Sequence, residues 1–475
     1  MINEIKLIPV TAASHPFATA VGKYHFTERG YVEEEYFMAG TANVYSEDDS
    51  ASIRIDYADL PYCNRFLVRK PKDITKFSGN VLIEILNPTA AMDLDRMWVI
   101  AGKHFMRRGD IYIGITSKPD VLDALMKFDW ERYSVINWGF PFERQAHEEP
   151  KTPGLPAMKA DCETGLFWDM LTDLCLLIKS EDDKNPVREY RPERVLLTGW
   201  SQSAGYLCTY VNKLAFDASY TKGQQLFDGY FAAGGVHFLT IPLNQEGFYH
   251  PEAKYSAKIN YMPVPFVAVQ TETENALLGG YEARQDNSNS ETLKYRIYEI
   301  PGPTHDTTGS LLDYYRGDTD VARIQMTPRY MGENEYPNDF PYEFPFHAAY
   351  EHFFRWVKDG IAPPCFERIE VDAEQNNIVD QDGNAIGGIR TPFLDYPTCH
   401  YIPYSDLNRE KFGLFGQSVP FSPKQLKARY GSLAQYKELI LQSTEAAILE
   451  GRLLEDDKEE IIKVVLEFAS KRGLI

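Results

Sequence analysis

Short, almost uninterrupted apolar runs are the feature that most constrains the fold of this chain. They cover residues 80–86, 110–115, 194–198, 229–233, 264–270 and 295–300. Strands buried on both faces have this pattern, whereas strands with one solvated face alternate between apolar and polar residues. Segments with helical periodicity lie between several of the runs, at about 98–108, at 166–179 and after residue 201. Buried strands that alternate with helices predict an α/β fold, with a mostly parallel sheet flanked by helices.

The regions around this core differ in composition. Up to about Lys70, alternating runs predict antiparallel strands that open the sheet. We expect a catalytic core over residues 1–358, interrupted by two long, loop-rich insertions that could act as lids, 236–263 and 310–345. Residues 359–475 are expected to pack on this core as an appended region, with a hairpin at 377–386 and two closing helices.

Charge and cysteine usage limit the partners and the compartment. The formal net charge is −20 and the isoelectric point is about 5.0, which disfavours binding to nucleic acid or anionic lipid. No run of about 18 apolar residues predicts a membrane span, and Met1–Val10 lacks the pattern of a signal peptide. The six cysteines are scattered without metal-type spacing, so we expect a reduced, cytoplasmic protein. Self-association into a homo-oligomer stays open.

The segment Gly199-Trp200-Ser201-Gln202-Ser203-Ala204-Gly205 is the sharpest chemical signal. A nucleophile elbow needs a buried strand, a sharp turn at the serine and a helix directly after it. Small residues must flank the strained turn, and Gly199 and Ser203 meet that need, although Ser203 departs from the strict G-x-S-x-G motif. A second G-x-S triplet at Gly416-Gln417-Ser418 lacks a preceding strand and is followed by Pro420. Ser201 is therefore the predicted nucleophile.

A serine hydroxyl needs a base to take its proton, and in this type of site the acid and the histidine follow the serine along the chain. His305 comes directly after the predicted strand 295–300, where a sheet builds its active site. Glu272 and Glu274 both follow the strand 264–270, and Glu274 stands at the usual offset for the acid. We predict Glu274 as the acid that orients the imidazole, with Glu272 as the alternative.

The developing oxyanion needs two hydrogen-bond donors. The backbone N–H of Gln202, at the start of the helix, is expected to be one of them. The other should come from the turn after the strand 80–86, where Pro88 has no N–H. Thr89 is therefore the candidate, with the side chain of Asn87 as an assistant.

Two tempting motifs fail. Residues 380–384 resemble the start of a calcium loop, but the twelfth position is Thr391 rather than a glutamate. No glycine-rich phosphate loop of either common type occurs. We therefore expect neither a metal nor a cofactor.

Several separate stretches resemble the bacterial proteins known as alpha/beta hydrolase domain-containing proteins, over almost the full chain. The matching stretches are 35–37, 40–42, 81–87, 112–116, 127–133, 199–205 and 387–390. The resemblance implies an α/β-hydrolase fold and an ester-type hydrolase that uses Ser201 and His305.

The residues and the resemblance together predict a serine esterase that cleaves a carboxylic ester or a lactone through an acyl-enzyme on Ser201. Esters are preferred because their leaving groups need less assistance than those of amides. An amidase or peptidase with the same triad is one alternative. A non-catalytic ligand-binding protein that retains the fold is another, because one fold can have many functions.

Overall fold

The computed structural model describes residues 1–17, 26–48, 52–140, 161–236, 241–249, 258–277, 279–312, 319–324, 336–404 and 414–475. The chain forms two compact units. Unit 1 contains residues 1–265 and 314–328, and unit 2 contains residues 266–313 and 329–475. The expected division into a core over residues 1–358 and an appended region over 359–475 stays a prediction.

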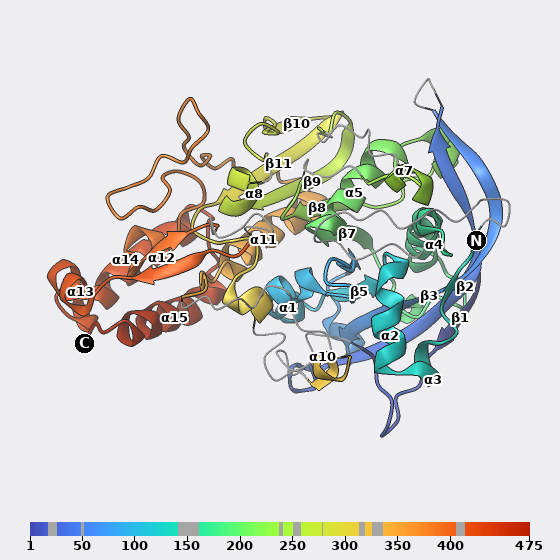
Figure 1. Ribbon diagram of the computed structural model, residues 1–475, viewed down its shortest axis with the longest axis horizontal. Coiled ribbons are helices and arrows are strands. Elements are labelled where there is room, and N and C mark those ends of the chain that lie inside the picture. Colours follow the sequence, from blue (N-terminus) through green and yellow to red (C-terminus); the bar gives the residue numbers. More distant parts are fainter. Residues whose placement is uncertain are drawn as a thin grey trace. The chain divides into compact units, whose positions relative to one another are not determined.

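Unit 1 is built on a mixed sheet with the strand order β1-β2-β3-β5-β4-β7-β8. Strands β4, β5, β7 and β8 are parallel, while β1, β2 and β3 are joined antiparallel to their neighbours. The long strands β2 and β3 pair with each other along their whole length and form the blue ribbon of Figure 1. Tyr31 lies opposite Pro71 at one end of this pair, and Glu47 lies opposite Ile53 at the other. The bounds are β1 (Ile2–Leu7), β2 (Tyr31–Glu47), β3 (Ile53–Pro71), β4 (Asn80–Ile85), β5 (Ile111–Ile115), β6 (Asn137–Trp138, paired with β3), β7 (Arg194–Trp200) and β8 (Gly229–Ala233).

The parallel strands of unit 1 form its core because most of their side chains are apolar on both faces of the sheet. Every residue of β4, β5 and β8 is buried. The helices that the structure describes in this unit are α1 (Arg96–Arg108), α2 (Leu122–Phe128), α3 (Trp130–Tyr133), α4 (Phe167–Ile178), α5 (Gln202–Lys213), α6 (Ala218–Thr221), α7 (Gln245–Tyr249) and α10 (Thr319–Arg323). Helix α1 ends at Gly109, whose φ of 85° is a left-handed conformation that glycine adopts readily.

Unit 2 contains the strands β9, β11 and β10 in that order, together with the C-terminal part of the chain. Its second, two-stranded sheet and its last helices are orange and red in Figure 1. The bounds are β9 (Met262–Thr271, which begins in unit 1), α8 (Glu272–Leu277), β10 (Ser288–Ser290), β11 (Leu293–Ile300), a π-helical turn (Thr308–Leu312), α11 (Glu343–Asp359), α12 (Pro392–Asp395), β12 (Cys399–Ile402), β13 (Gln417–Pro420), α13 (Pro423–Tyr430), α14 (Leu433–Leu449) and α15 (Lys458–Lys471).

The structure agrees with the expected elements in most places. The six apolar runs are strands, the opening strands are antiparallel, and α14 and α15 are the two closing helices. At the expected hairpin, single bridges join Val379 to Ala385 and Val371 to Asn377. Much of the two expected lids lies outside the described residues, at 237–240, 250–257, 313–318 and 325–335. A lid role for these insertions stays a prediction.

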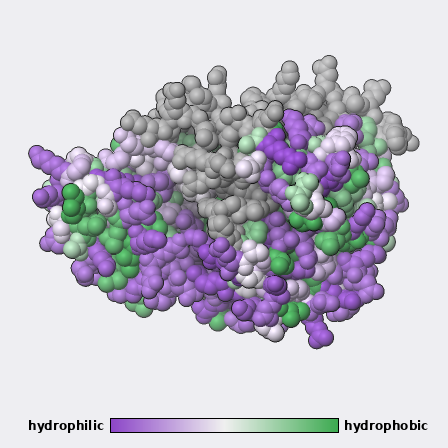
Figure 2. Space-filling model, turned by 90° about the horizontal axis from the view of Figure 1, so that it is seen from below, coloured by the Kyte–Doolittle hydropathy of each residue, from purple (hydrophilic) through white to green (hydrophobic). Residues whose placement is uncertain are grey.

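Polar residues dominate the coloured part of the face shown in Figure 2, and hydrophobic residues form small groups between them. No helix in the described part of the chain is long and apolar enough to cross a membrane. All six cysteines are free thiols, and Cys365 is exposed.

Candidate active-site residues

Ser201 occupies a strained turn between β7 and α5. Its φ of 58° and ψ of −120° are unusual for a residue with a side chain, and such strain persists only where the surroundings enforce it. The Ser201 N–H donates to the carbonyl of Ala233 at 2.8 Å, and the Ser201 carbonyl accepts from Gly205 N–H at 3.1 Å. Trp200 and Gln202 are buried, while Ser201 is only partly buried. This strand–turn–helix geometry is that of a nucleophile elbow.

Small neighbours make this turn sterically possible. A Cβ atom on Gly199 would lie 2.7 Å from the backbone oxygen of Ser203, too close for any side chain. A Cβ atom on Gly235 would lie 3.2 Å from the oxygen of Ser201. Ser203, which replaces the usual second glycine, donates its hydroxyl to the carbonyl of Leu86 at 3.2 Å. The departure from the usual motif therefore adds a bond between α5 and the end of β4.

The turn after β4 is attached directly to the elbow. The side-chain amide of Asn87 donates to the carbonyl of Trp200 at 2.8 Å, and the backbone N–H of Thr89 donates to Asn87 Oδ1 at 3.0 Å. The two expected oxyanion donors in this turn, the side-chain amide of Asn87 and the N–H of Thr89, are thus bonded within unit 1. Their oxyanion role stays a prediction, and it would require these bonds to be exchanged.

Two other donors stand at the same turn and elbow. The hydroxyl of Thr89 is buried and makes no hydrogen bond within the described part of the structure. The N–H of Gln202 belongs to the first residue of α5, where an amide has no acceptor within its own helix. These two groups are the donors that the local geometry leaves for an anionic oxygen.

Buried ion pairs fix the far side of the same turn. Asp93 binds the guanidinium of Arg65 at 2.8 Å, and Asp95 binds that of Arg69. Glu35 provides a second carboxylate for Arg65. Removing one partner of a buried pair leaves an uncompensated charge, which costs about 3–5 kcal/mol. The segment 87–95 is therefore held at one end by the elbow and at the other by β3.

Glu84 is a buried carboxylate that the sequence analysis did not single out. It lies in the middle of β4 and accepts hydrogen bonds from Met97 N–H at 2.9 Å, Trp98 N–H at 3.2 Å and the hydroxyl of Tyr112 at 2.7 Å. Burial raises the pKa of Glu84 to about 8. A single carboxylate in an otherwise apolar strand is the sequence signal that could have found it. In the structure it caps the first turn of α1.

In unit 2, Glu274 is bonded to His305. The carboxylate oxygen Oε1 lies 2.6 Å from His305 Nδ1, and the two side chains are 0% and 4% exposed. Glu274 also accepts the hydroxyl of Thr271 at 2.9 Å and the N–H of that residue. The donors around Glu274 aim its carboxylate at the imidazole.

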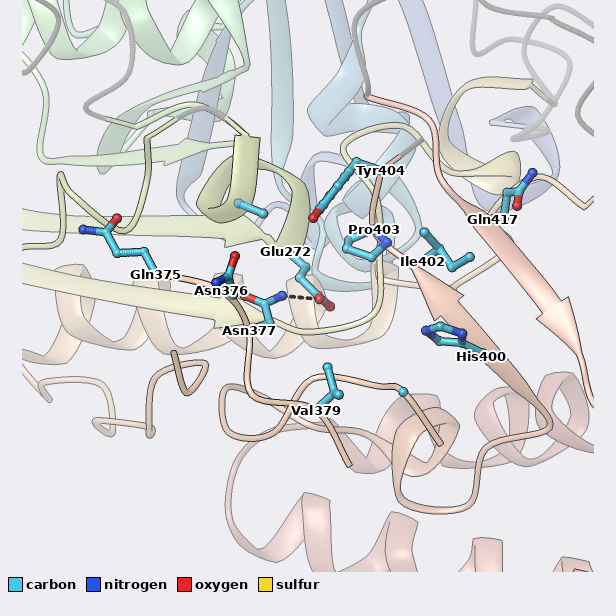
Figure 3. A pocket seen from close by; sticks show the side chains of 12 residues that line it. Glu272, Gln375, Asn376, Asn377, Val379, His400, Ile402, Pro403, Tyr404 and Gln417 are labelled. Atoms are coloured by element: carbon cyan, nitrogen blue, oxygen red, sulfur yellow. Dashed lines mark hydrogen bonds between the residues drawn. The ribbon is translucent and has the colours of Figure 1, made fainter. Parts of the chain in front are cut away.

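Glu272, the alternative acid, has different partners. It accepts the N–H of Gly302 at 2.6 Å and the side-chain amide of Asn377, the bond drawn in Figure 3. Burial raises the pKa of Glu272 to about 7. Between these two residues Thr273 accepts the N–H of His305 at 3.0 Å. Of the two competing carboxylates, Glu274 contacts the ring and Glu272 contacts the loop that leads to it.

The described residues contain no group of three or more His, Cys, Asp or Glu side chains placed to hold a metal ion. The groups that the structure brings together fall into two sets. Ser201, Gln202, Asn87 and Thr89 belong to unit 1, whereas Glu272, Glu274 and His305 belong to unit 2.

A parallel sheet with helices and a serine at a nucleophile elbow defines the class of α/β hydrolases. A comparison with protein families agrees, because the family described as alpha/beta hydrolase domain matches residues 4–463. The chain therefore belongs to this family and has its fold.

The comparisons with individual proteins are much weaker. A lipase/esterase from Lactobacillus plantarum is 10% identical with a TM-score of 0.32, covering 55% of this chain and 91% of its own. An S-formylglutathione hydrolase from Agrobacterium tumefaciens is 9% identical with a TM-score of 0.30, covering 62% of this chain and 95% of its own. No curated protein sequence matches the chain.

Proposed function

We propose that this protein is a serine hydrolase that cleaves a carboxylic ester or a lactone through an acyl-enzyme on Ser201. The observation that carries the proposal is the backbone of Ser201, with φ of 58° and ψ of −120° directly after β7. An ordinary helix cap does not need this strain, whereas a nucleophile elbow does. The buried bond between His305 and Glu274 supplies the base and the acid that such a serine needs.

The first half of the reaction forms the acyl-enzyme. The Ser201 oxygen attacks the carbonyl carbon while its proton passes to His305 Nε2, which requires the two atoms to come within hydrogen-bond reach. Because Nδ1 donates to Glu274, Nε2 is the nitrogen that can take the proton. The negative oxygen of the tetrahedral intermediate would accept the N–H of Gln202, with Thr89 as the second donor. When the intermediate collapses, the alcohol leaves with the proton from the imidazolium.

The second half returns the enzyme to its starting state. Water attacks the acyl carbon and gives a proton to His305, and the acid product then leaves as the Ser201 oxygen regains its proton. Glu274 keeps its charge throughout and stabilises the imidazolium. We favour esters over amides because an alkoxide is a better leaving group than an amide nitrogen.

Labelling by a fluorophosphonate tests the activated serine. Wild type should be labelled, and Ser201→Ala and His305→Ala should both lose the label. Ser418→Ala is the matched control, because Ser418 lies in the second G-x-S triplet but within β13 rather than at a turn. Its labelling should stay intact. Absence of label on folded wild type would refute the proposal.

A matched ester and amide pair then tests bond preference, and faster cleavage of the amide would refute the ester assignment.

A further inference from the structure

The first turn of α8 binds the histidine loop, residues 301–305, at three successive positions. Glu272 accepts the N–H of Gly302, Thr273 accepts the N–H of His305, and Glu274 accepts from the imidazole ring of His305. The proposed mechanism uses only the third of these bonds directly. The other two act on the backbone that carries the base.

Side chains rather than regular secondary structure determine the path of this loop at Gly302. Its N–H is bound by Glu272 at 2.6 Å, and its carbonyl accepts the side-chain amide of Asn338 at 2.9 Å. Gly302 has a φ of 95°, and a Cβ atom there would lie 2.8 Å from the ring of Phe340. The peptide groups on both sides of this residue therefore depend on two buried side chains.

The second oxygen of Glu272 connects the loop to a distant part of unit 2. It accepts the amide of Asn377, whose own oxygen accepts the hydroxyl of Tyr281. The amide of Asn377 is thereby oriented, because a flip would turn its oxygen toward the carboxylate of Glu272, which can only accept a hydrogen bond. Glu272 itself is 3% exposed and is one of the residues that line a cavity of about 540 Å³, together with both polar residues such as His400 and Gln417 and apolar ones such as Ile402 (Figure 3).

We propose that Glu272, oriented by Asn377, is a positioning residue that fixes the histidine loop and thereby the place of His305. This inference rests on the proposed function, because it assigns Glu272 to the loop of the proposed base. The carboxylate accepts one hydrogen bond from the loop and one from Asn377, so it links the position of Asn377 to that of Gly302. Glu272 does not contact the reacting atoms.

Kinetics of three variants test this role. Glu272→Ala removes both bonds, so kcat should fall about 10- to 100-fold while KM changes less than twofold, because misplacing the base slows the chemical step. Glu272→Gln keeps an oxygen for Gly302 and should recover part of the loss. Adding Asn377→Ala to Glu272→Ala should lower kcat little further, because the two residues act on the loop through one bond. His400→Ala, which alters the same cavity without touching Glu272, is the control.

Hydrogen exchange of the peptide that covers residues 301–306 provides a measurement independent of turnover. Glu272→Ala should speed its exchange at least several-fold, and His400→Ala should not. If wild type fails to react with esters or the phosphonate, the proposed function fails while the exchange result still decides whether Glu272 holds the loop. Unchanged exchange, unchanged kcat, or a loss confined to KM would each overturn the positioning role, the last by indicating a substrate site in the cavity.

Discussion

The described part of unit 2 contains two buried histidine–carboxylate pairs that look alike as isolated contacts. His305 Nδ1 lies 2.6 Å from Glu274, and His347 Nδ1 lies 2.8 Å from Asp457. All four side chains are at most 4% exposed. Bond length and burial therefore give no reason to propose a catalytic role for one pair rather than the other.

The two pairs differ in the elements that they join. Glu274 follows β9 and His305 follows β11, so both stand where a strand ends, as catalytic residues of open α/β sheets commonly do. His347 lies inside α11, and Asp457 precedes α15, so this pair joins two helices. The comparison teaches that position in the fold, more than the contact itself, supports the proposed chemical role of His305 and Glu274.

The largest expected effect separates the pairs by activity. Glu274→Gln should lower kcat about 10³- to 10⁴-fold, because an amide cannot hold the imidazole in the required tautomer or stabilise its charge. Asp457→Asn is the matched control and should leave kcat within about threefold at 25 °C. Steady-state ester hydrolysis measures both. Comparable losses in the two variants would show that the pairs are not functionally distinct.

The effects on thermal stability should have the opposite order, with Asp457→Asn lowering Tm more than Glu274→Gln does. Asp457→Asn weakens a buried bond between helices, with a cost of about 1–3 kcal/mol and a fall in Tm of roughly 2–10 °C. Calorimetry of wild type, Asp457→Asn and Glu274→Gln measures the difference. A catalytic site is often held at some cost in stability, so Glu274→Gln should change Tm less than Asp457→Asn does. A larger fall for Glu274→Gln would contradict a mainly chemical role for that pair.

A smaller effect should follow from the backbone contact beside the first pair. Thr273→Val removes the hydroxyl that accepts the N–H of His305 and donates to the carbonyl of Pro403. We expect kcat to fall about tenfold, since one lost hydrogen bond is worth about 1 kcal/mol or somewhat more. Thr273→Ser keeps the hydroxyl and should recover most of the rate. Equal rates for the valine and serine variants would exclude the hydroxyl as the cause.

The smallest effect concerns Glu84, a buried carboxylate without a histidine. Burial raises the pKa of Glu84 from 4.5 to about 8, so the native state binds this proton more readily than the unfolded state does. Its contribution to stability is therefore present below about pH 4.5 and is lost as the pH rises through about 8. Glutamine does not titrate. The Tm of wild type minus that of Glu84→Gln should fall by a few degrees between pH 5 and pH 9. A constant difference would refute the raised pKa.

The sequence predicts the features that depend on residues close to one another along the chain. The elbow was recognisable because an apolar strand, small flanking residues and an amphipathic helix are contiguous around Ser201. His305 and Glu274 could be ranked because each directly follows an apolar run. The choice of Glu274 over Glu272 agrees with the bond that the structure places on His305.

Long-range side-chain contacts could not be read in the same way. Asn377 reaches Glu272 across 105 positions, and Asn87 reaches Trp200 across 113. The hydrophobic periodicity of a sequence does not predict which side chains will bond to each other, because such pairs depend on how distant segments pack. The bond from the Asn87 amide to the carbonyl of Trp200 is therefore a contact that the sequence does not predict, and the oxyanion role of Asn87 stays a prediction.

The boundary between the two units lies inside the strand β9. Pro265 and Phe266 are consecutive residues of β9, whereas domain boundaries usually lie in exposed linkers. A gene divided there would give one fragment with four residues of that strand and another with six. The second fragment would also contain residues 314–328, which belong to the first unit. Chain dissection is thus a poor way to study this protein, and point substitutions in the full chain are the better tool.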